Sequence, residues 1–336
     1  MTRLSSSRLI EVKKILVIQT SFIGDVILAT SLLEALHASF PEASIDLMVR
    51  KGSESIFSGH PFIGNVLVWD KKSGKYKNLL QIIKKVRAEP YDLIVNPHRF
   101  ASSGLVCAFS KAKHTVGFKK NPLHFLFSQS FKHSFDVQHE INRNHALIEQ
   151  FIGNKEPSKP QLYPQTTDFE KVKRFKEVTY RCFAPTSVWF TKQWHSDRWV
   201  ELIDRMPHSE NVYLLGAPED QAQCDEILAQ STHPKIKTLA GTLTLLQSAA
   251  LMRDAKMNYV NDSAPMHLCS ATNAPTTVIY CSTVPAFGFG PLSSNSNIIE
   301  TTEKLDCRPC GLHGHKACPK QHFKCSSTIS LSQFDL

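Results

Sequence analysis

The first residue that could carry chemistry is a carboxylate at a strand-to-helix junction. The apolar run KKILVI at 13–18 is followed by SFIGDVILAT, so that Asp25 comes directly after Gly24. Glycine permits a tight turn at the end of the strand, from which the acid would project out of the first helical turn. A carboxylate in this position can merely complement the helix dipole, or it can act as a general base toward a hydroxyl group.

A second group of polar residues stands at the end of the apolar run MNYV. In VNDSAPMHL, Asp262 and Ser263 lie where a helix is expected to begin, and His267 follows one turn later. Backbone amides at a helix N-terminus, with hydroxyl groups beside them, form a phosphate site, although Asp or Ser there is also a common helix cap. His267 favours a site, because nothing requires a polar side chain on a helix otherwise packed by Met266 and Leu268.

Three further strand ends carry candidates for a nucleotide diphosphate and its ribose. Lys192 lies in SVWFTKQWHSDRW, between tryptophans, and could neutralise a diphosphate, although a lysine in a loop is more often simply solvated. Glu219 or Asp220, after the run NVYLLG, could accept hydrogen bonds from ribose hydroxyls. Neither GxGxxG nor GxxxxGK[ST] occurs, so dinucleotide dehydrogenases and P-loop enzymes lose support. The remaining hydroxyl donors at strand ends are Ser187, Ser282 and Thr283.

The net charge is concentrated in the first half of the chain. Residues 1–160 hold 22 basic and 13 acidic side chains, a net of +9, whereas residues 161–336 hold 17 of each. The excess either keeps the surface soluble or attracts an anionic partner, such as a phospholipid surface or an acidic glycolipid. No nucleic-acid-binding signature accompanies it, so we expect no nucleic-acid partner. Within this half, Asn96, His98 and Arg99 follow the predicted strand YDLIV.

Alternating strands and helices must position these candidates. In the first half, apolar patterns predict strands over 13–18, 44–49, 65–69, 91–98 and 114–118 and helices over 25–38 and 76–88. In the second half, they predict helices over 168–178, 195–206, 218–230, 243–255 and 264–273 and strands over 181–187, 211–216, 257–262 and 276–282. Such alternation is typical of α/β domains with parallel sheets, whose ligands collect at the carboxyl ends of the strands.

The proline-containing segment at 153–167 separates the two halves. We therefore expect a domain over 1–160, a second domain over 161–305 and a cysteine-rich tail over 306–336. Both domains should be doubly wound and Rossmann-like, facing each other across a cleft. The start MTRLSSSRLIEVKK has no apolar core of a secretory signal, and the apolar runs are too short for a membrane span. A cytoplasmic protein is the expectation.

Four of the nine cysteines crowd into the tail, as Cys307, Cys310, Cys318 and Cys325. Four thiols that begin with a CxxC pair would suit a tetrahedral structural zinc ion. Free thiols in a tight loop are the alternative, and disulfides are a third reading that the missing export signal does not favour. Any metal is expected in this tail and not in the active site.

Four stretches of the chain resemble the lipopolysaccharide heptosyltransferases, the family 9 glycosyltransferases of GT-B fold, and most of all their heptosyltransferase II type. In chain order they are GDVILATSLLEALHASFPEASIDLMV, APTSVWFTKQWHSDRWVELI, YLLGAPED and NDSAPMHLCSATNAPTTVIYCST. The similarity extends over most of the chain and includes the spacing. One departure is the end CSSTISLSQFDL, because GT-B proteins usually finish with a helix that crosses back to the first domain; here that helix should be short or missing.

The resemblance implies an inverting transfer of L-glycero-D-manno-heptose from ADP-heptose to the inner core on lipid A, at the cytoplasmic face of the inner membrane. It implies that Asp25 is the catalytic aspartate and that the first domain binds the acceptor; Asn96, His98 and Arg99, at a strand end of that domain, are the expected acceptor contacts. It places the donor in the second domain, with contacts from Ser187, Lys192, Glu219 or Asp220, Asp262, His267 and Thr283. Ser263 and Ser282 extend this set as hydroxyl donors at the same strand ends.

The expected reaction needs a base and a means of stabilising the departing diphosphate. Without a DxD-like acidic pair, the diphosphate charge should be met by Lys192, hydroxyl groups and a helix end, so no cofactor is expected. Two other functions stay open: a GT-B glycosyltransferase with a different nucleotide sugar, and a non-catalytic protein that binds polyanions or membrane surfaces. Asp25 separates them, because a binding protein needs no carboxylate in the cleft.

Overall fold

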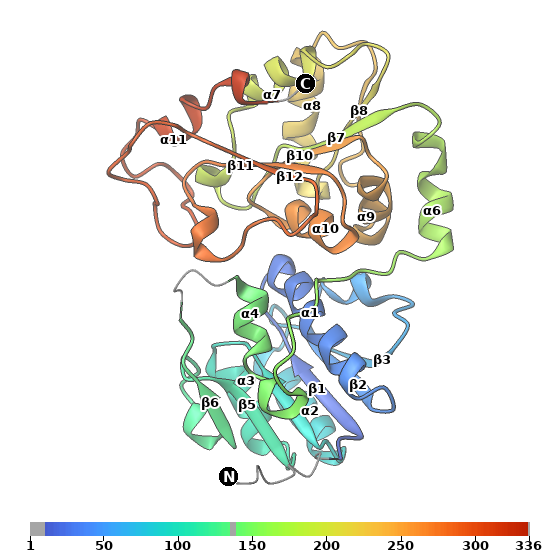
Figure 1. Cartoon of the computed structure of the whole chain (residues 1–336), viewed down its shortest axis with the longest axis vertical. Helices are drawn as coiled ribbons and strands as arrows, with labels where there is room; N and C mark the ends of the chain where they lie inside the picture. Colours follow the sequence, from blue (N-terminus) through green and yellow to red (C-terminus); the bar gives the residue numbers. More distant parts are fainter. Residues whose placement is uncertain (1–10, 135–138, 335–336) are drawn as a thin grey trace, which may run out of the picture. The chain divides into compact units, whose positions relative to one another are not determined.

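The computed structural model describes residues 11–134 and 139–334. These residues form two compact units. Within the described ranges, the first unit comprises 11–134 and 140–160, and the second comprises His139 and 161–334. Each unit is an α/β structure with its own sheet and its own covering helices (Figure 1).

The first unit is built on a six-stranded parallel sheet in the order β3-β2-β1-β4-β5-β6. Its strands are β1 (Lys14–Ile18), β2 (Ser44–Arg50), β3 (Ile63–Trp69), β4 (Leu93–Asn96), β5 (His114–Phe118) and β6 (Gln129–Phe131). Its helices are α1 (Ile23–Ser39), α2 (Lys75–Ala88), α3 (Ala101–Phe109), α4 (Glu140–His145) and α5 (Glu149–Ile152). The central strands are continuous apolar runs because helices cover both faces of the sheet: α1 packs with α4 and α5, and α2 packs with α3.

The second unit repeats this topology in the order β12-β11-β10-β7-β8-β9. Its strands are β7 (Tyr180–Ala184), β8 (Asn211–Leu214), β9 (Ile236–Thr238), β10 (Met257–Asn261), β11 (Thr276–Tyr280) and β12 (Ser296–Glu300). Its helices are α6 (Thr166–Val172), α7 (Ser196–Asp204), α8 (Gln221–Gln230), α9 (Leu245–Arg253), α10 (Ala264–Thr272) and α11 (Lys324–Ser327). Helices α7 and α8 cover one face of the sheet and α9 and α10 the other (Figure 1).

The expected α/β class and doubly wound sheets are confirmed. In both sheets the strand order reverses at the centre, between β1 and β4 and between β7 and β10, which is where ligands of doubly wound folds bind. The carboxyl ends of neighbouring strands therefore carry the candidate residues of each unit. The edge strands β6, β9 and β12 were not predicted, because runs of three to five residues with polar positions leave no clear apolar pattern.

The expectation of a glycine turn before Asp25 is wrong. Helix α1 begins at Ile23, two residues earlier than predicted, so Gly24 lies inside its first turn. The glycines with positive φ do not include Gly24. The chain turns instead over residues 19–22, where the amide of Gln19 still donates to the carbonyl of Met48 at 2.9 Å. Asp25 nevertheless lies in the first turn of α1, as expected.

The described part of the tail packs onto the second unit. Phe323, Cys325 and Phe334 join the hydrophobic core that also contains Trp194 and Trp199. The Phe334 ring stacks on the Trp194 indole with 5.3 Å between ring centroids. This segment holds the four-residue helix α11 and the short 3-10 turn η7 (Leu331–Gln333). Among the described residues, no helix is both long enough and apolar enough to cross a bilayer.

Candidate functional site

Asp25 is held in the first turn of α1 by a short hydrogen bond from its own loop. The hydroxyl of Ser21 donates to Asp25 Oδ2 at 2.7 Å, and the Asp25 side chain is half-buried. The residue before the helix, Phe22, offers no side-chain cap. The Arg50 guanidinium, at the end of the adjacent strand β2, interacts electrostatically with the Asp25 carboxylate and lies 4.8 Å from the centre of the Phe22 ring. This arrangement orients a carboxylate at the carboxyl edge of the sheet.

Two cations near this edge were not among the predicted site residues. Arg50 ends β2, which lies next to β1, and Lys71 follows β3, which lies on the other side of β2 in the sheet order. Lys71 Nζ donates to the Thr20 carbonyl at 2.6 Å and lies 4.6 Å from the centre of the Trp69 ring. Burial, with repulsion from Arg50 and Lys75, lowers the pKa of Lys71 to about 8. Scanning every strand end for charged residues would have found both.

The predicted acceptor residues Asn96, His98 and Arg99 differ in their accessibility. Asn96 is fully buried, and its Oδ1 accepts from the His98 amide at 3.2 Å, so it stabilises the loop after β4 from the interior. His98 is also buried, with its Nδ1 3.2 Å from Thr20 Oγ1. Arg99 is exposed, and its guanidinium lies 5.2 Å from the centre of the Phe100 ring. Arg99 and His98 therefore flank the edge where Asp25 and Lys71 lie, whereas Asn96 supports it.

His98 provides a prediction for the pH dependence of stability. Burial first, and then repulsion from Lys71 and Arg99, lowers the pKa of His98 to about 3. A histidine in the unfolded chain titrates near pH 6.5, so the unfolded state gains this proton first as the pH falls. The stability that comes from keeping His98 neutral is complete above about pH 6.5 and is lost as the pH falls toward about 3.

Below pH 6.5, the His98 effect alone should lower the free energy of unfolding by about 1.4 kcal/mol per pH unit. Urea unfolding of the wild type and of His98→Gln at pH 6 and pH 5 measures it. The variant should lose that part of the slope, and His208→Gln, at an exposed histidine, should keep it. Equal slopes in wild type and His98→Gln would contradict a neutral His98 in the folded protein.

In the second unit, two of the residues predicted to bind the nucleotide sugar contact the carboxylate of a third. Lys192 Nζ lies 2.7 Å from Asp262 Oδ2, and the Thr283 hydroxyl donates to the same oxygen at 2.6 Å. They meet because β10 pairs with both β7 and β11, which brings the three following loops together. The Lys192 and Asp262 side chains are 16% and 7% exposed, so the pair is largely shielded from water but still reachable. A buried cation with a hydroxyl beside it suits a phosphate group.

His267 adds an unsatisfied polar atom next to this cluster. Its ring is 6% exposed, and its Nδ1 is buried without a hydrogen-bond partner among the described residues. Burial lowers the pKa of His267 to about 4, although the Asp262 carboxylate acts in the opposite direction. A neutral, buried imidazole nitrogen without a partner costs about 1–3 kcal/mol, which a ligand could relieve. Neither Asp262 nor Ser263 caps α10 through its side chain, so the ordinary capping explanation does not apply.

The three serines that were predicted to bind the nucleotide sugar differ in their burial and hydrogen bonds. Ser263 begins the entry to α10 and makes only long contacts, at 3.4 and 3.5 Å, to the carbonyls of Asn261 and Thr186. Ser187 is half-buried in the loop after β7. The Ser282 hydroxyl is directed elsewhere, because it donates to Thr191 Oγ1 at 3.0 Å and is buried.

The structure separates the two acids after β8. Asp220 Oδ2 accepts from the amide of Ala217 at 2.8 Å, so its carboxylate closes its own turn. Glu219, one residue earlier, is exposed. Of the two candidates for a ribose contact, Glu219 is the one with an accessible carboxylate, and Asp220 shapes the loop that presents it.

Part of the tail forms hydrogen bonds with the loops that carry Lys192 and Thr283, which the sequence did not predict. Arg308 donates to the carbonyls of Cys281 at 2.7 Å and Thr283 at 2.9 Å and pairs with Glu300 at 2.6 Å. The His315 amide donates to Thr191 Oγ1 at 2.8 Å, next to Lys192. Residues 308–315 thus fix both Thr283 and the Lys192 loop from outside. No local motif marks Arg308, because its partners are distant in the sequence.

Of the three alternatives for the four tail cysteines, the structure agrees with free thiols and not with a zinc site. All nine cysteines lie in the described ranges and are free thiols. Across those ranges, no group of three or more His, Cys, Asp and Glu side chains could hold a metal ion. The reason is packing: Cys325 is buried in the core of the second unit, where Cys318 packs against it, and burial raises the pKa of the Cys325 thiol to about 11.

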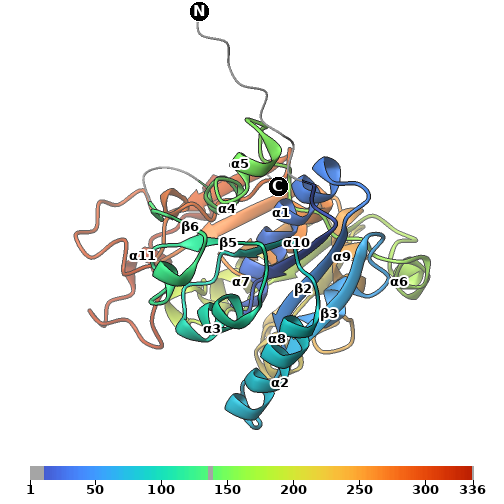
Figure 2. The ribbon, with the colours of Figure 1, turned by 90° about the horizontal axis from the view of Figure 1, so that it is seen from below.

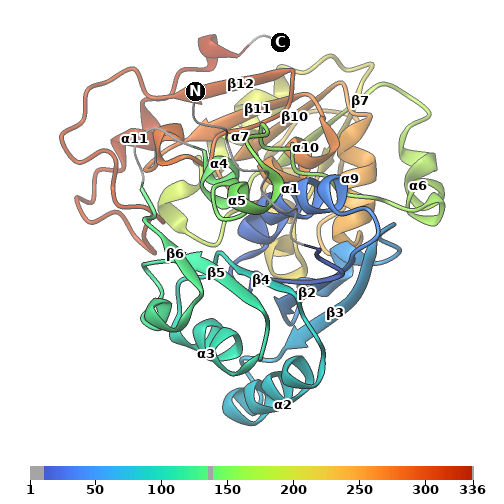
Figure 3. The same cartoon turned by 60° about the horizontal axis from the view of Figure 1, so that its bottom comes forward.

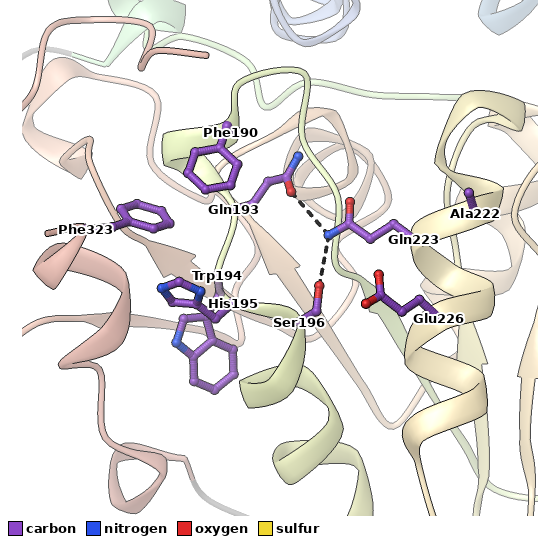
Figure 4. Close-up of a pocket in the computed structure, with 9 residues that line it drawn as sticks. All are labelled: Phe190, Gln193, Trp194, His195, Ser196, Ala222, Gln223, Glu226 and Phe323. Atoms are coloured by element: carbon purple, nitrogen blue, oxygen red, sulfur yellow. Dashed lines mark hydrogen bonds between the residues drawn. The ribbon is translucent and has the colours of Figure 1, made fainter. Parts of the chain in front are cut away.

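A pocket of about 400 Å³ in the second unit lies between the starts of α7 and α8 and the tail (Figure 4). Its lining residues are Phe190, Gln193, Trp194, His195, Ser196, Ala222, Gln223, Glu226 and Phe323. Gln223 Nε2 joins Gln193 Oε1 at 3.2 Å and Ser196 Oγ at 3.4 Å across it. None of the predicted donor residues lines this pocket, so we place the candidate site at the strand ends, where the charged groups converge.

Comparison with known proteins identifies the family and the fold. A family model described as glycosyltransferase family 9 (heptosyltransferase) matches residues 79–319. The chain is 26% identical to lipopolysaccharide heptosyltransferase 3 of Escherichia coli K12 over 283 residues, which cover 79% of this chain and 81% of the relative.

Solved structures share the fold. A family 9 glycosyl transferase from Veillonella parvula superposes with a TM-score of 0.80 at 21% identity and covers 88% of both chains. The ADP-heptose LPS heptosyltransferase II of E. coli superposes with a TM-score of 0.74 at 24% identity, over 88% of this chain and 95% of that one. Two parallel six-stranded sheets in this arrangement correspond to the GT-B fold.

Proposed function

The chain belongs to glycosyltransferase family 9, the heptosyltransferases, and on that premise we propose that it transfers L-glycero-D-manno-heptose from ADP-heptose to the inner core of lipopolysaccharide with inversion. The observation that carries the proposal is the convergence of Lys192 and Thr283 on Asp262 at the carboxyl ends of adjacent strands. A protein of the same fold is named as an ADP-heptose LPS heptosyltransferase, which supports the choice of donor.

The second unit would hold the donor through groups that match a nucleoside diphosphate. Lys192 and the Thr283 hydroxyl neutralise and hydrogen-bond the phosphates, and the unpartnered nitrogen of His267 supplies a further polar contact. The exposed carboxylate of Glu219 accepts from the ribose hydroxyls. Ser187 and Ser263 lie at the same strand ends as further hydroxyl donors, and Ser282 supports Thr191 in the Lys192 loop. With the charge met in this way, the reaction needs no metal or other cofactor.

The first unit would hold the acceptor and the base. Arg50, Lys71 and Arg99 offer positive charge to the anionic groups of the acceptor. The Asp25 carboxylate takes the proton of the acceptor hydroxyl, whose oxygen then forms a bond to the anomeric carbon of the heptose. The bond from that carbon to the diphosphate oxygen breaks, and ADP leaves with the electron pair. Attack opposite to the leaving group inverts the anomeric centre.

The acceptor would be lipid-linked, so we propose that the protein works at the cytoplasmic face of the inner membrane. The surplus of positive charge in residues 1–160 supports contact with an anionic surface. Exposed lysines and arginines close to such a surface are attracted over about one Debye length. The partners of the reaction are thus ADP-heptose and the lipid A inner core.

A donor experiment tests the proposal. We expect calorimetry to show binding of ADP and tighter binding of ADP-heptose, with UDP and GDP weaker, because the proposed donor is an ADP-sugar. Turnover of ADP-heptose on a lipid A acceptor with a truncated inner core should continue in EDTA, and NMR of the product should show inverted anomeric configuration. Preference for UDP- or GDP-sugars, or turnover that EDTA abolishes and magnesium restores, would contradict the proposal.

A further inference from the structure

Helix α2 combines positive charge with exposed apolar side chains on one face. Five of its fourteen residues are basic and none is acidic. Tyr76 is 75% exposed and Leu80 is 60% exposed. These two residues are four positions apart, so their side chains lie one above the other on the helix surface. Lys84 and Arg87 continue the same stripe, which means that the apolar and basic groups can reach one flat partner together.

The opposite face of α2 is fully used by the core of its own unit. Leu79, Ile82 and Val86 pack into a hydrophobic cluster with Trp69 of β3. The Trp69 indole nitrogen donates to the Lys75 carbonyl at 3.1 Å, which pins the start of the helix. Tyr76 and Leu80 lie outside this cluster and are exposed, and together with Phe109 they form an apolar group at the surface rather than a single exposed side chain.

The charge of α2 is not neutralised by the acids at its two ends. Asp70 before the helix pairs with Lys51 at 2.9 Å, and Glu89 after it pairs with Lys14 at 2.5 Å. Lys72, just before the helix, is also exposed. At the far end, Arg87 Nη1 donates to the carbonyl of Phe109, whose ring is 50% exposed at the end of α3. Helices α2 and α3 lie side by side on one face of the unit (Figures 2 and 3).

We infer that α2, with Phe109 beside it, docks the protein on an anionic lipid surface. Basic amphipathic helices with aromatic and leucine side chains lie in the interface of a bilayer, where apolar groups enter the acyl boundary and lysines meet anionic headgroups. Positive charge without acids selects a negatively charged partner. The inference deepens the proposed function by naming the surface through which a lipid-linked acceptor is approached.

The position of α2 connects this surface to the acceptor edge of the first unit. Lys71, which donates to the Thr20 carbonyl beside Asp25, stands four residues before the start of the helix. The same basic segment therefore runs from the carboxyl edge of the sheet to the exposed helix. A lipid surface held at α2 would bring anionic headgroups next to Lys71 without any rearrangement of the unit.

Flotation of the full-length protein with vesicles tests the inference without donor or acceptor. The protein should bind vesicles that contain phosphatidylglycerol and should bind pure phosphatidylcholine vesicles far less, with binding weakened by salt. Each basic residue near an anionic surface strengthens binding roughly fivefold. Lys84→Glu/Lys85→Glu should therefore lower the partition coefficient at least about tenfold, and Tyr76→Gln/Leu80→Gln should lower it on its own.

Matched controls come from the second unit. Lys171→Glu/Lys173→Glu changes the charge equally at two exposed lysines, and Val178→Gln replaces an apolar side chain that is 43% exposed. Both should bind vesicles like the wild type. Circular dichroism and calorimetry with ADP should show folded protein and unchanged nucleotide affinity in every variant. Absence of ADP binding in a protein that still binds vesicles would count against the proposed function and not against the docking surface.

Two results would overturn the inference. One is equal binding of the α2 variants, the controls and the wild type to anionic vesicles. The other is sedimentation in which the wild type self-associates and Tyr76→Gln/Leu80→Gln is monomeric, because the exposed stripe would then be covered by a second copy of the chain. Loss of vesicle binding in the α2 variants, with monomeric wild type, supports a lipid surface as the occupant.

Discussion

Replacing Asp25 by asparagine should lower kcat by roughly 10²–10⁴, the usual contribution of a positioned general base. Asparagine keeps the shape of the side chain and can still accept the hydrogen bond from Ser21. ADP affinity and the melting temperature should therefore barely change. The reason for the loss is that an amide cannot take the proton from the acceptor hydroxyl as the new bond to the anomeric carbon forms.

The competing explanation for Asp25 is the dipole of α1, which would contribute only about 0.3–1 kcal/mol of stability. Asp197 provides the matched control, because it is the acid in the first turn of α7 and is exposed. Asp197→Asn should retain full turnover. Single-turnover measurements with saturating donor separate chemistry from binding, and an Asp25→Asn enzyme that keeps more than about a tenth of wild-type turnover would rule out the base.

Replacing Lys192 by alanine should weaken ADP binding by about 1.5–3 kcal/mol, as for the loss of a hydrogen bond to a charged group. That corresponds to a dissociation constant roughly ten- to a hundredfold higher. The ammonium lies beside Asp262 and the Thr283 hydroxyl, so its removal takes away the only cation of this cluster within the described contacts of Asp262. Isothermal titration calorimetry with ADP measures the effect directly.

Lys192→Ala also leaves the shielded Asp262 carboxylate without its cation, which could destabilise the unit. The double variant Lys192→Met/Asp262→Asn removes both charges, so it separates a lost phosphate contact from a destabilised fold. Lys71→Ala is the matched control in the first unit, because Lys71 is also half-buried and hydrogen-bonded. It should raise KM for the acceptor and leave ADP affinity unchanged. Wild-type ADP affinity in both Lys192 variants would refute the diphosphate contact.

The sequence alone determined the architecture because the signals for it are local. Apolar runs such as KILVI at 14–18 and TTVIY at 276–280 became central parallel strands, and amphipathic stretches such as 75–88 became helices. Since ligands of such sheets collect at strand ends, the polar residues there could be named in advance. Asp25, Lys192, Asp262 and Thr283 were found in this way, and three of them form one cluster.

Only the tertiary structure decided which of these residues act together. Asn96 was predicted to contact a ligand but is fully buried. Asp220 was predicted, like Glu219, to contact a ribose, but its carboxylate accepts from the Ala217 amide. The cysteines of the tail read like metal ligands, yet Cys325 is buried in a hydrophobic core. Neighbours from distant parts of the chain bury Asn96 and Cys325, whereas Asp220 is engaged within its own turn.

The site residues that were not predicted are also placed by contacts between distant segments of the chain. Arg50 and Lys71 approach Asp25 and Thr20 because β2 lies beside β1 and β3 lies beside β2 in the sheet order. Arg308 reaches the loop of Thr283 because the tail folds back across the end of β11. Strand order and chain return are set by packing between segments far apart in sequence, which no local pattern encodes. The sequence by itself therefore determined the central strands, the long helices and the residue types at their ends, and the sheet order decided which of those side chains meet.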